Sequence, residues 1–219
     1  MKMSFLSCLV TLMYKSKAVK IIFVLYAFVF LTSCVSSQPQ DINDVCAIFG
    51  ERRGWFEAAK SSEERWGIPI AVNMAIIYQE SSFRARAKPE RSRVLWVLPG
   101  PRASSAYGYS QALDSTWKEY KRISGRKRAS RSDFKDAVDF VGWYNANSSR
   151  ASSIAGTDAH SLYLAYHEGN AGFQRGSYRG KQWLIEAANR VQMNSERFDS
   201  QLDGCSKEFE KGWLRRLFS

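Results

Sequence analysis

Residues 70–77 are apolar at every position except Asn73, and no other feature limits the fold as strongly. Pro69 precedes this stretch and suits a first helical position, because its missing N–H would have no partner there. The pattern predicts a helix from Pro69 to about Gln79 that is apolar nearly all round. Such a helix is buried rather than amphipathic, so other elements must enclose it.

The segments that could enclose this helix are also helical in pattern. Apolar residues recur at helical spacing, which predicts helices beginning at Asp44, at Asp114 or Ser115, at Asp133, at Thr157 or Asp158, and at about Gln182. The last of these is expected to end near Phe198 with Trp183 facing inward, and Gly169 is placed to end the one before it. Strand-like alternation is scarce, and Val94–Leu98 is a candidate for a short strand or for a wall packed beside a cleft. We therefore expect an all-α (mainly helical α+β) fold in a single domain.

The N-terminal residues predict export. Ile21–Leu31 is an uninterrupted apolar run that follows Lys15, Lys17 and Lys20. A basic segment followed by an apolar run of this length is typical of a secretory signal, whereas a membrane-spanning helix needs about 20 apolar residues. We expect residues 1–33 to be this signal, and a start at Met13 would make it more compact than a start at Met1.

The end of the signal is more specific. Leu31–Cys34 resembles the lipobox of bacterial lipoproteins, in which the cysteine is lipidated and becomes the mature N-terminus. Val35 follows, in place of the aspartate that favours inner-membrane retention in such lipoproteins. The resemblance implies a lipid on Cys34, residues 34–44 as a polar tether, and a location on the periplasmic face of the outer membrane. A plain signal peptide with an incidental cysteine is the alternative.

Two cysteines remain for the mature domain, because Cys8 would leave with the signal and Cys34 would carry lipid. In an oxidising periplasm Cys46 and Cys205 are expected to form a disulfide that joins the ends of a domain over residues 45–205. Two free buried thiols are the alternative. Residues 206–219 mix bases with apolar side chains and would form a basic amphipathic tail.

The chain carries a formal net charge of +11, and this falls to +7 once the four lysines of the signal leave without any acid. A basic exported protein could approach anionic lipid head groups, an anionic wall polymer or nucleic acid. Residues 125–131 hold much of the charge, but no aromatic side chain lies between the bases. Nucleic acid is therefore not an expected partner.

Glu80 stands where the apolar helix ends. Burial penalises the charged form of a carboxyl group, and a helix C-terminus disfavours negative charge as well. Both effects raise the pKa of Glu80 and keep a proton on it near neutral pH, as a general acid requires. A glutamate that merely ends the helix at the surface is the competing interpretation.

Three short segments follow one another at predicted helix junctions. They read QESSF at residues 79–83, GYSQ at 108–111 and AYHEG at 165–169. Together they resemble the three motifs of the soluble lytic transglycosylase family and its goose-type lysozyme relatives, which are an E-S pair, a G-L-M-Q turn and an A-Y-N-A-G segment. The resemblance covers about residues 68–172 and implies a lysozyme-like, SLT-type catalytic domain.

The resemblance also implies a reaction on peptidoglycan. Glu80 would protonate the β-1,4 glycosidic oxygen between N-acetylmuramic acid and N-acetylglucosamine. It would then take the proton of the muramoyl C6 hydroxyl, which closes a 1,6-anhydro ring without water. By the same resemblance Ser81 would steady Glu80 or the substrate, Ser110 and Gln111 would line the cleft, and Tyr166 would form a hydrogen bond near Glu80.

This sequence departs from the family motifs at three positions. Ser110 replaces a methionine, so the apolar contact with the sugar face is lost or supplied by Tyr109. His167 and Glu168 replace an asparagine and an alanine. Glu168 adds a carboxylate that could raise the pKa of Glu80 by repulsion, unless it lies on a solvated helix end. His167 is expected to be a hydrogen-bonding wall residue; no ligand cluster accompanies it, so neither a metal nor a cofactor is expected.

Two other functions stay open on the sequence alone. A hydrolytic muramidase would use a second carboxylate about 5–9.5 Å from the first, and Asp114 and Glu168 are the candidates for it. A non-catalytic, peptidoglycan-binding lipoprotein would keep the cleft without the reaction. In that case Glu80→Gln would leave its function intact.

Overall fold

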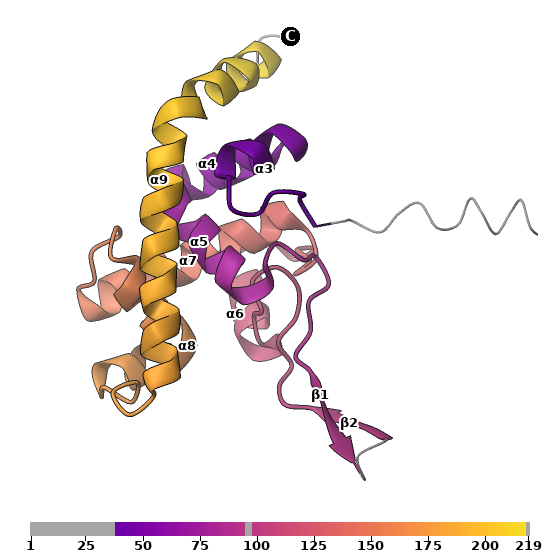
Figure 1. Cartoon of the computed structure of the whole chain (residues 1–219), viewed down its shortest axis with the longest axis vertical. Coiled ribbons are helices and arrows are strands. Elements are labelled where there is room, and N and C mark those ends of the chain that lie inside the picture. The colour runs from indigo at the N-terminus through magenta and orange to yellow at the C-terminus, as the bar shows by residue number, and fades with distance from the viewer. Residues whose placement is uncertain (1–37, 95–97, 218–219) are drawn as a thin grey trace, which may run out of the picture. The chain divides into compact units, whose positions relative to one another are not determined.

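The computed structural model describes residues 38–94 and 98–217, and the elements of this part are almost all helices (Figure 1). They are α3 (Val45–Glu51), α4 (Trp55–Trp66), α5 (Ile70–Ser81), β1 (Arg91–Val94), β2 (Leu98–Arg102), α6 (Asp114–Ser124), α7 (Phe134–Ser152), α8 (Ala159–Gln174) and α9 (Gln182–Leu217). The expected mainly helical fold is confirmed. The predicted signal, Cys34 and Val35 lie outside the described residues.

Helix α5 is the buried helix that the sequence predicts. Every residue from Ile70 to Ile77 is buried, and α4, α7, α8 and α9 pack around the helix. The single polar residue of this stretch, Asn73, donates from its amide nitrogen to the carbonyl oxygen of Ile68 at 3.2 Å. Ser82 ends the helix in a left-handed conformation with φ 50°.

Aspartates begin three of the helices as the sequence predicts. Asp44 accepts hydrogen bonds from the backbone of α3, Asp133 from that of α7 and Asp158 from that of α8. Helix α6 begins at Asp114 as expected, but the expectation that Asp114 or Ser115 caps it is wrong, because its N-cap is Leu113 and no side chain caps it. Asp114 instead forms an ion pair with Arg131 at 2.6 Å.

Helix α9 is much longer than the sequence predicts. It continues past Phe198 through Cys205 to Leu217, so residues 206–217 extend the helix. It packs against α3, α5 and α8. The prediction that Trp183 faces inward is wrong, since this residue is 56% exposed.

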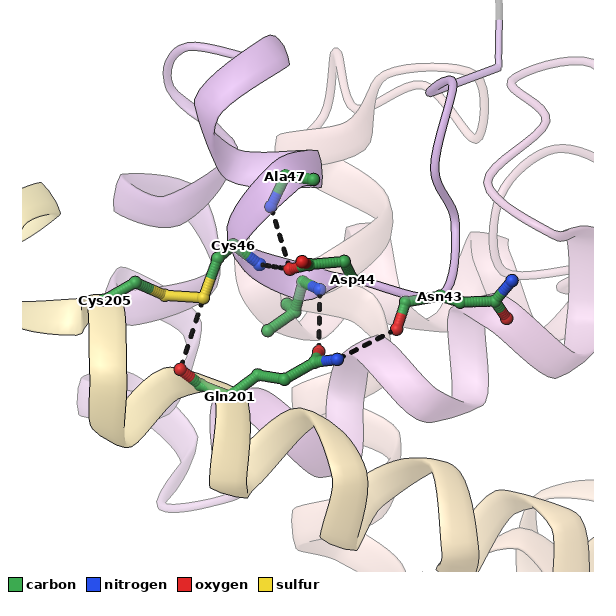
Figure 2. The surroundings of a disulfide bond; sticks show 7 residues. Asn43, Asp44, Cys46, Ala47, Gln201 and Cys205 are labelled. Atoms are coloured by element: carbon green, nitrogen blue, oxygen red, sulfur yellow. Dashed lines mark hydrogen bonds between the residues drawn. A yellow bond between two sulfur atoms is a disulfide. The ribbon is translucent and has the colours of Figure 1, made fainter.

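A disulfide between Cys46 and Cys205 joins α3 to α9, which confirms the predicted pair (Figure 2). Beside it, the side chain of Gln201 accepts from the backbone N–H of Val45 at 2.9 Å and donates to the carbonyl of Asn43 at 3.1 Å. The sulfur of Cys46 lies 3.2 Å from the carbonyl oxygen of Gln201, a contact without a hydrogen because the sulfur is disulfide-bonded. The two ends of the domain are therefore joined by covalent and polar contacts together.

Strands β1 and β2 form an antiparallel hairpin that projects from the helices (Figure 1). Val94 pairs with Leu98 across it, so the expected single strand over these residues is wrong. At the N-terminal side, the described end of the predicted tether packs on the domain. Gln38 donates to the carbonyl of Ser82 at 2.6 Å, and the hydroxyl of Tyr78 donates to Asn43 at 3.0 Å.

Within residues 38–94 and 98–217, no helix combines the length and the apolar character that crossing a membrane requires.

Candidate active site

Glu80 occupies the last turn of α5, immediately before the left-handed Ser82 that ends the helix. The residue as a whole is half-buried. Burial raises the pKa of this carboxyl from 4.5 to about 7. A group with this pKa can donate and accept a proton near neutral pH, which is the property expected from the sequence.

Tyr163 of α8 contacts Glu80 directly. This buried tyrosine donates a hydrogen bond from its hydroxyl to the carboxylate, which lowers the pKa of Glu80 and only partly offsets the effect of burial. The pKa of Tyr163 is raised by burial and by the charge of Glu80. Sequence reasoning missed Tyr163, and its spacing of three residues from Tyr166 on one helix is the signal that could have found it.

Tyr166 also lies near Glu80, but its hydrogen bond goes elsewhere. Its hydroxyl donates to the backbone carbonyl of Ser110 at 2.6 Å, which ties α8 to the 108–111 turn. Burial and the charge of Glu80 raise its pKa well above the ordinary value. The ring packs edge-to-face on Tyr144 at 5.0 Å. Glu80, Tyr163, Tyr166 and the Ser110 backbone are thus brought together.

The turn at residues 108–111 requires its glycine. Gly108 has φ 78°, and a Cβ atom there would lie 2.0 Å from the carbonyl oxygen of Arg131. Gln111 also has a positive φ, of 48°, and its side-chain amide donates to the carbonyls of Ala87 at 3.0 Å and Gly108 at 2.8 Å. The amide group of Gln111 therefore holds the turn in place.

Three residues that the sequence places at the substrate are buried. The hydroxyl of Ser81 donates to the carbonyl of Ile77 in its own helix at 3.2 Å. Tyr109 packs edge-to-face on Trp55 and Phe134, with ring centroids 5.5 and 5.6 Å apart. The buried hydroxyl of Ser110 has no hydrogen-bond partner among the residues the structure describes. Substrate contacts for these three side chains stay predictions.

Glu168 is not on a solvated helix end, since its side chain is only 5% exposed. Lys181 donates to its two oxygens at 2.7 and 2.9 Å, and the hydroxyl of Ser177 donates to it as well. The hydrogen bond from Lys181 is the main reason that the pKa of Glu168 is lowered to about 2. The shift of Glu80 is explained by burial and Tyr163, so the expected repulsion by Glu168 is not found within the described part of the chain.

His167 is exposed and neighbours this ion pair. Its Nδ1 lies 3.1 Å from a carboxylate oxygen of Glu168, and its ring meets Trp183 edge-to-face with centroids 5.0 Å apart. Across residues 38–94 and 98–217, no group of three or more His, Cys, Asp or Glu side chains could hold a metal ion.

A mainly helical domain with a half-buried glutamate at the end of its buried helix is the arrangement that the lysozyme-like resemblance of the sequence implies. The family model described as the Transglycosylase SLT domain matches residues 22–205, which is most of the chain. The protein therefore belongs to the transglycosylase SLT domain family. This membership implies a glycan-cleaving enzyme of the lytic transglycosylase kind, with peptidoglycan glycan as its substrate. No curated protein matches the chain.

Proposed function

We propose that this protein cleaves the glycosidic bond between N-acetylmuramic acid and N-acetylglucosamine without water, with Glu80 as the sole acid and base. Protonated Glu80 donates its proton to the glycosidic oxygen, and the bond from that oxygen to the muramoyl C1 breaks. The C6 hydroxyl of the same muramoyl residue then attacks C1, and its proton returns to Glu80. The product ends in a 1,6-anhydro ring, and the enzyme is left as it began.

The observation that carries this proposal is the raised pKa of Glu80. A pKa of about 7 lets one carboxyl give up a proton and recover it at neutral pH. Tyr163 donates to the ionised form, so it stabilises the carboxylate that exists after the first step.

A hydrolytic muramidase is the other reading of the same bond cleavage. The two carboxylates suggested for it are already paired, Glu168 with Lys181 and Asp114 with Arg131. Asp114 is exposed and Glu168 is held by three donors, and neither raises the pKa of Glu80. These pairings favour the mechanism with a single carboxylate.

Product analysis tests the proposal. Purified sacculi are digested with the wild-type protein and with Glu80→Gln, and the released muropeptides are identified by mass spectrometry. Anhydromuramoyl ends from the wild type alone support the mechanism. Reducing muramoyl ends would instead assign hydrolysis, and equal release by both proteins would exclude Glu80 as the catalytic residue.

We further propose that the protein acts from the periplasmic face of the outer membrane, held by a lipid on Cys34. The lipobox resemblance of Leu31–Cys34 and the residue Val35 support this location. Metabolic labelling with a fatty acid should mark the wild type and not Cys34→Ser. Density separation of the two membranes should then place the labelled protein in the outer-membrane fraction.

A further inference from the structure

Among the side chains that the structure describes, Trp183 is the large aromatic one that is mostly exposed to solvent. It lies in the first turn of α9, is 56% exposed, and its ring meets the exposed ring of His167. An exposed indole can bury a large apolar surface against a ligand, and tryptophan is enriched at binding interfaces, so Trp183 is a candidate contact for a ligand.

The position of Trp183 relative to Glu80 follows from α8. Tyr163 holds the carboxylate of Glu80, and His167 lies four residues later on the same face of the helix. Slightly more than one turn of helix, about 6 Å, separates the two residues along the axis. Trp183 therefore contacts His167, and His167 lies about one helical turn beyond Tyr163, which holds the carboxylate of Glu80.

The surroundings fix Trp183 in place. Lys181, two residues before it, forms an ion pair with Glu168 at 2.7 Å, and Glu168 also accepts from Ser177. The carboxylate thus ties the start of α9 and the segment before it to α8. Because Glu168 neighbours His167 in the chain, the same ion pair keeps the histidine and Trp183 together.

We propose that Trp183, supported by His167, is a stacking platform for an N-acetylhexosamine of the glycan strand, beyond the sugars at the cleaved bond. One face of a β-linked pyranose carries only C–H groups, which can lie flat on an indole and bury apolar surface. The proposal rests on the proposed function for the identity of the glycan. It makes Trp183 a residue that selects long strands over short ones.

Binding of β-1,4-linked N-acetylglucosamine oligomers to the mature full-length protein tests this platform. Glu80→Gln serves as the background, so that no cleavage occurs, and Trp183→Ala and Trp183→Tyr are added to it. Trp183→Ala should weaken binding of the hexamer about tenfold, or about 1.4 kcal/mol, and that of the dimer by about twofold or less. Trp183→Tyr should retain most of the hexamer affinity because it keeps an aromatic face.

Met193→Ala is the matched control, since Met193 is exposed by 60% on the same helix. It should leave hexamer binding unchanged, and circular dichroism should show the fold of every variant intact. Equal hexamer affinity of Trp183→Ala and its background would overturn the platform, as would an equal loss in Met193→Ala. If the wild type releases no anhydro product while hexamer binding still depends on Trp183, the proposed reaction fails and the platform stands.

Discussion

The hydroxyl of Tyr163 donates a hydrogen bond to the carboxylate of Glu80, and this contact opposes the burial that raises the pKa of that carboxylate. Burial is the larger effect, so the pKa settles at about 7 rather than near the ordinary 4.5. A group that must first donate and then accept a proton works best when its pKa lies close to the working pH. The pair is therefore a means of setting this pKa.

Tyr163→Phe should move the pKa of Glu80 upward. The substitution removes a donor that favours the charged form, while the burial that favours the neutral form stays. The alkaline limb of the pH dependence of kcat/KM should shift to higher pH. Tyr166→Phe is the control, because that hydroxyl donates to Ser110 and its loss should leave the limb in place. A limb that stays or moves downward in Tyr163→Phe would contradict this assignment.

Glu80→Gln should lower turnover by at least about 10²-fold, as expected when a general acid is removed.

The same substitution should also change how the stability of the protein depends on pH. The pKa of Glu80 rises from 4.5 to about 7 on folding, so the folded state binds more protons between these values. The wild type should lose up to about 3 kcal/mol as the pH rises through this window.

The glutamine variant has no such titration. Its melting temperature relative to the wild type should therefore increase between pH 4.5 and pH 7 and level off above. Thermal unfolding of both proteins across this range checks the prediction. A constant difference between them would mean that Glu80 titrates at its ordinary value in the folded state.

The sequence predicts the central helix and its glutamate because burial leaves a direct pattern, with apolar residues on all sides of α5. Caps such as Asp133 are also predictable, since their hydrogen bonds are local. Tyr163 lies outside the 165–169 segment whose resemblance indicates Tyr166, and its spacing from Tyr166 predicts only that the two rings share one side of a helix. Packing alone decides that Tyr163 contacts Glu80 while Tyr166 contacts Ser110.

Other errors have the same origin in contacts distant along the chain. Glu168 looks like a solvated residue or a second active-site charge until Lys181, thirteen residues later, is seen to neutralise it. Trp183 follows the apolar spacing of α9, but it lies in the exposed first turn of that helix. There it contacts His167 of α8 instead of the hydrophobic core. The disulfide was predictable because Cys8 is expected to leave with the signal and Cys34 to carry lipid. Only Cys46 and Cys205 then remain to pair.

Removing the disulfide should destabilise the domain substantially. Cys46 and Cys205 are 159 residues apart, and closing a loop of this size restricts the unfolded chain by about 5 kcal/mol in the chain-entropy model. Cys46→Ala with Cys205→Ala should therefore unfold at a much lower denaturant concentration than the oxidised wild type. Adding reductant should lower the midpoint of the wild type and leave the double variant unchanged. Equal midpoints of the oxidised wild type and the variant would show that the bond adds nothing.

Gly108→Ala should disrupt the turn that carries Ser110 and Gln111. The new Cβ would lie 2.0 Å from the backbone oxygen of Arg131, and backbone cannot move aside as a flexible side chain would. Gly125→Ala is the matched control, because Gly125 has a similar φ of 74° with nothing within 4 Å of its Cβ position. The control should cost about 1 kcal/mol, from the left-handed backbone alone.

Gly108→Ala should cost more than about 2 kcal/mol, since the steric clash adds to the backbone strain. It should also lower activity at temperatures where the protein is still folded, because the Ser110 carbonyl that holds Tyr166 would shift. Chemical denaturation and kcat/KM of the two variants measure these effects. If the two alanine variants lose the same stability, the turn yields to the new side chain, and the close approach to Arg131 does not explain the glycine of this motif.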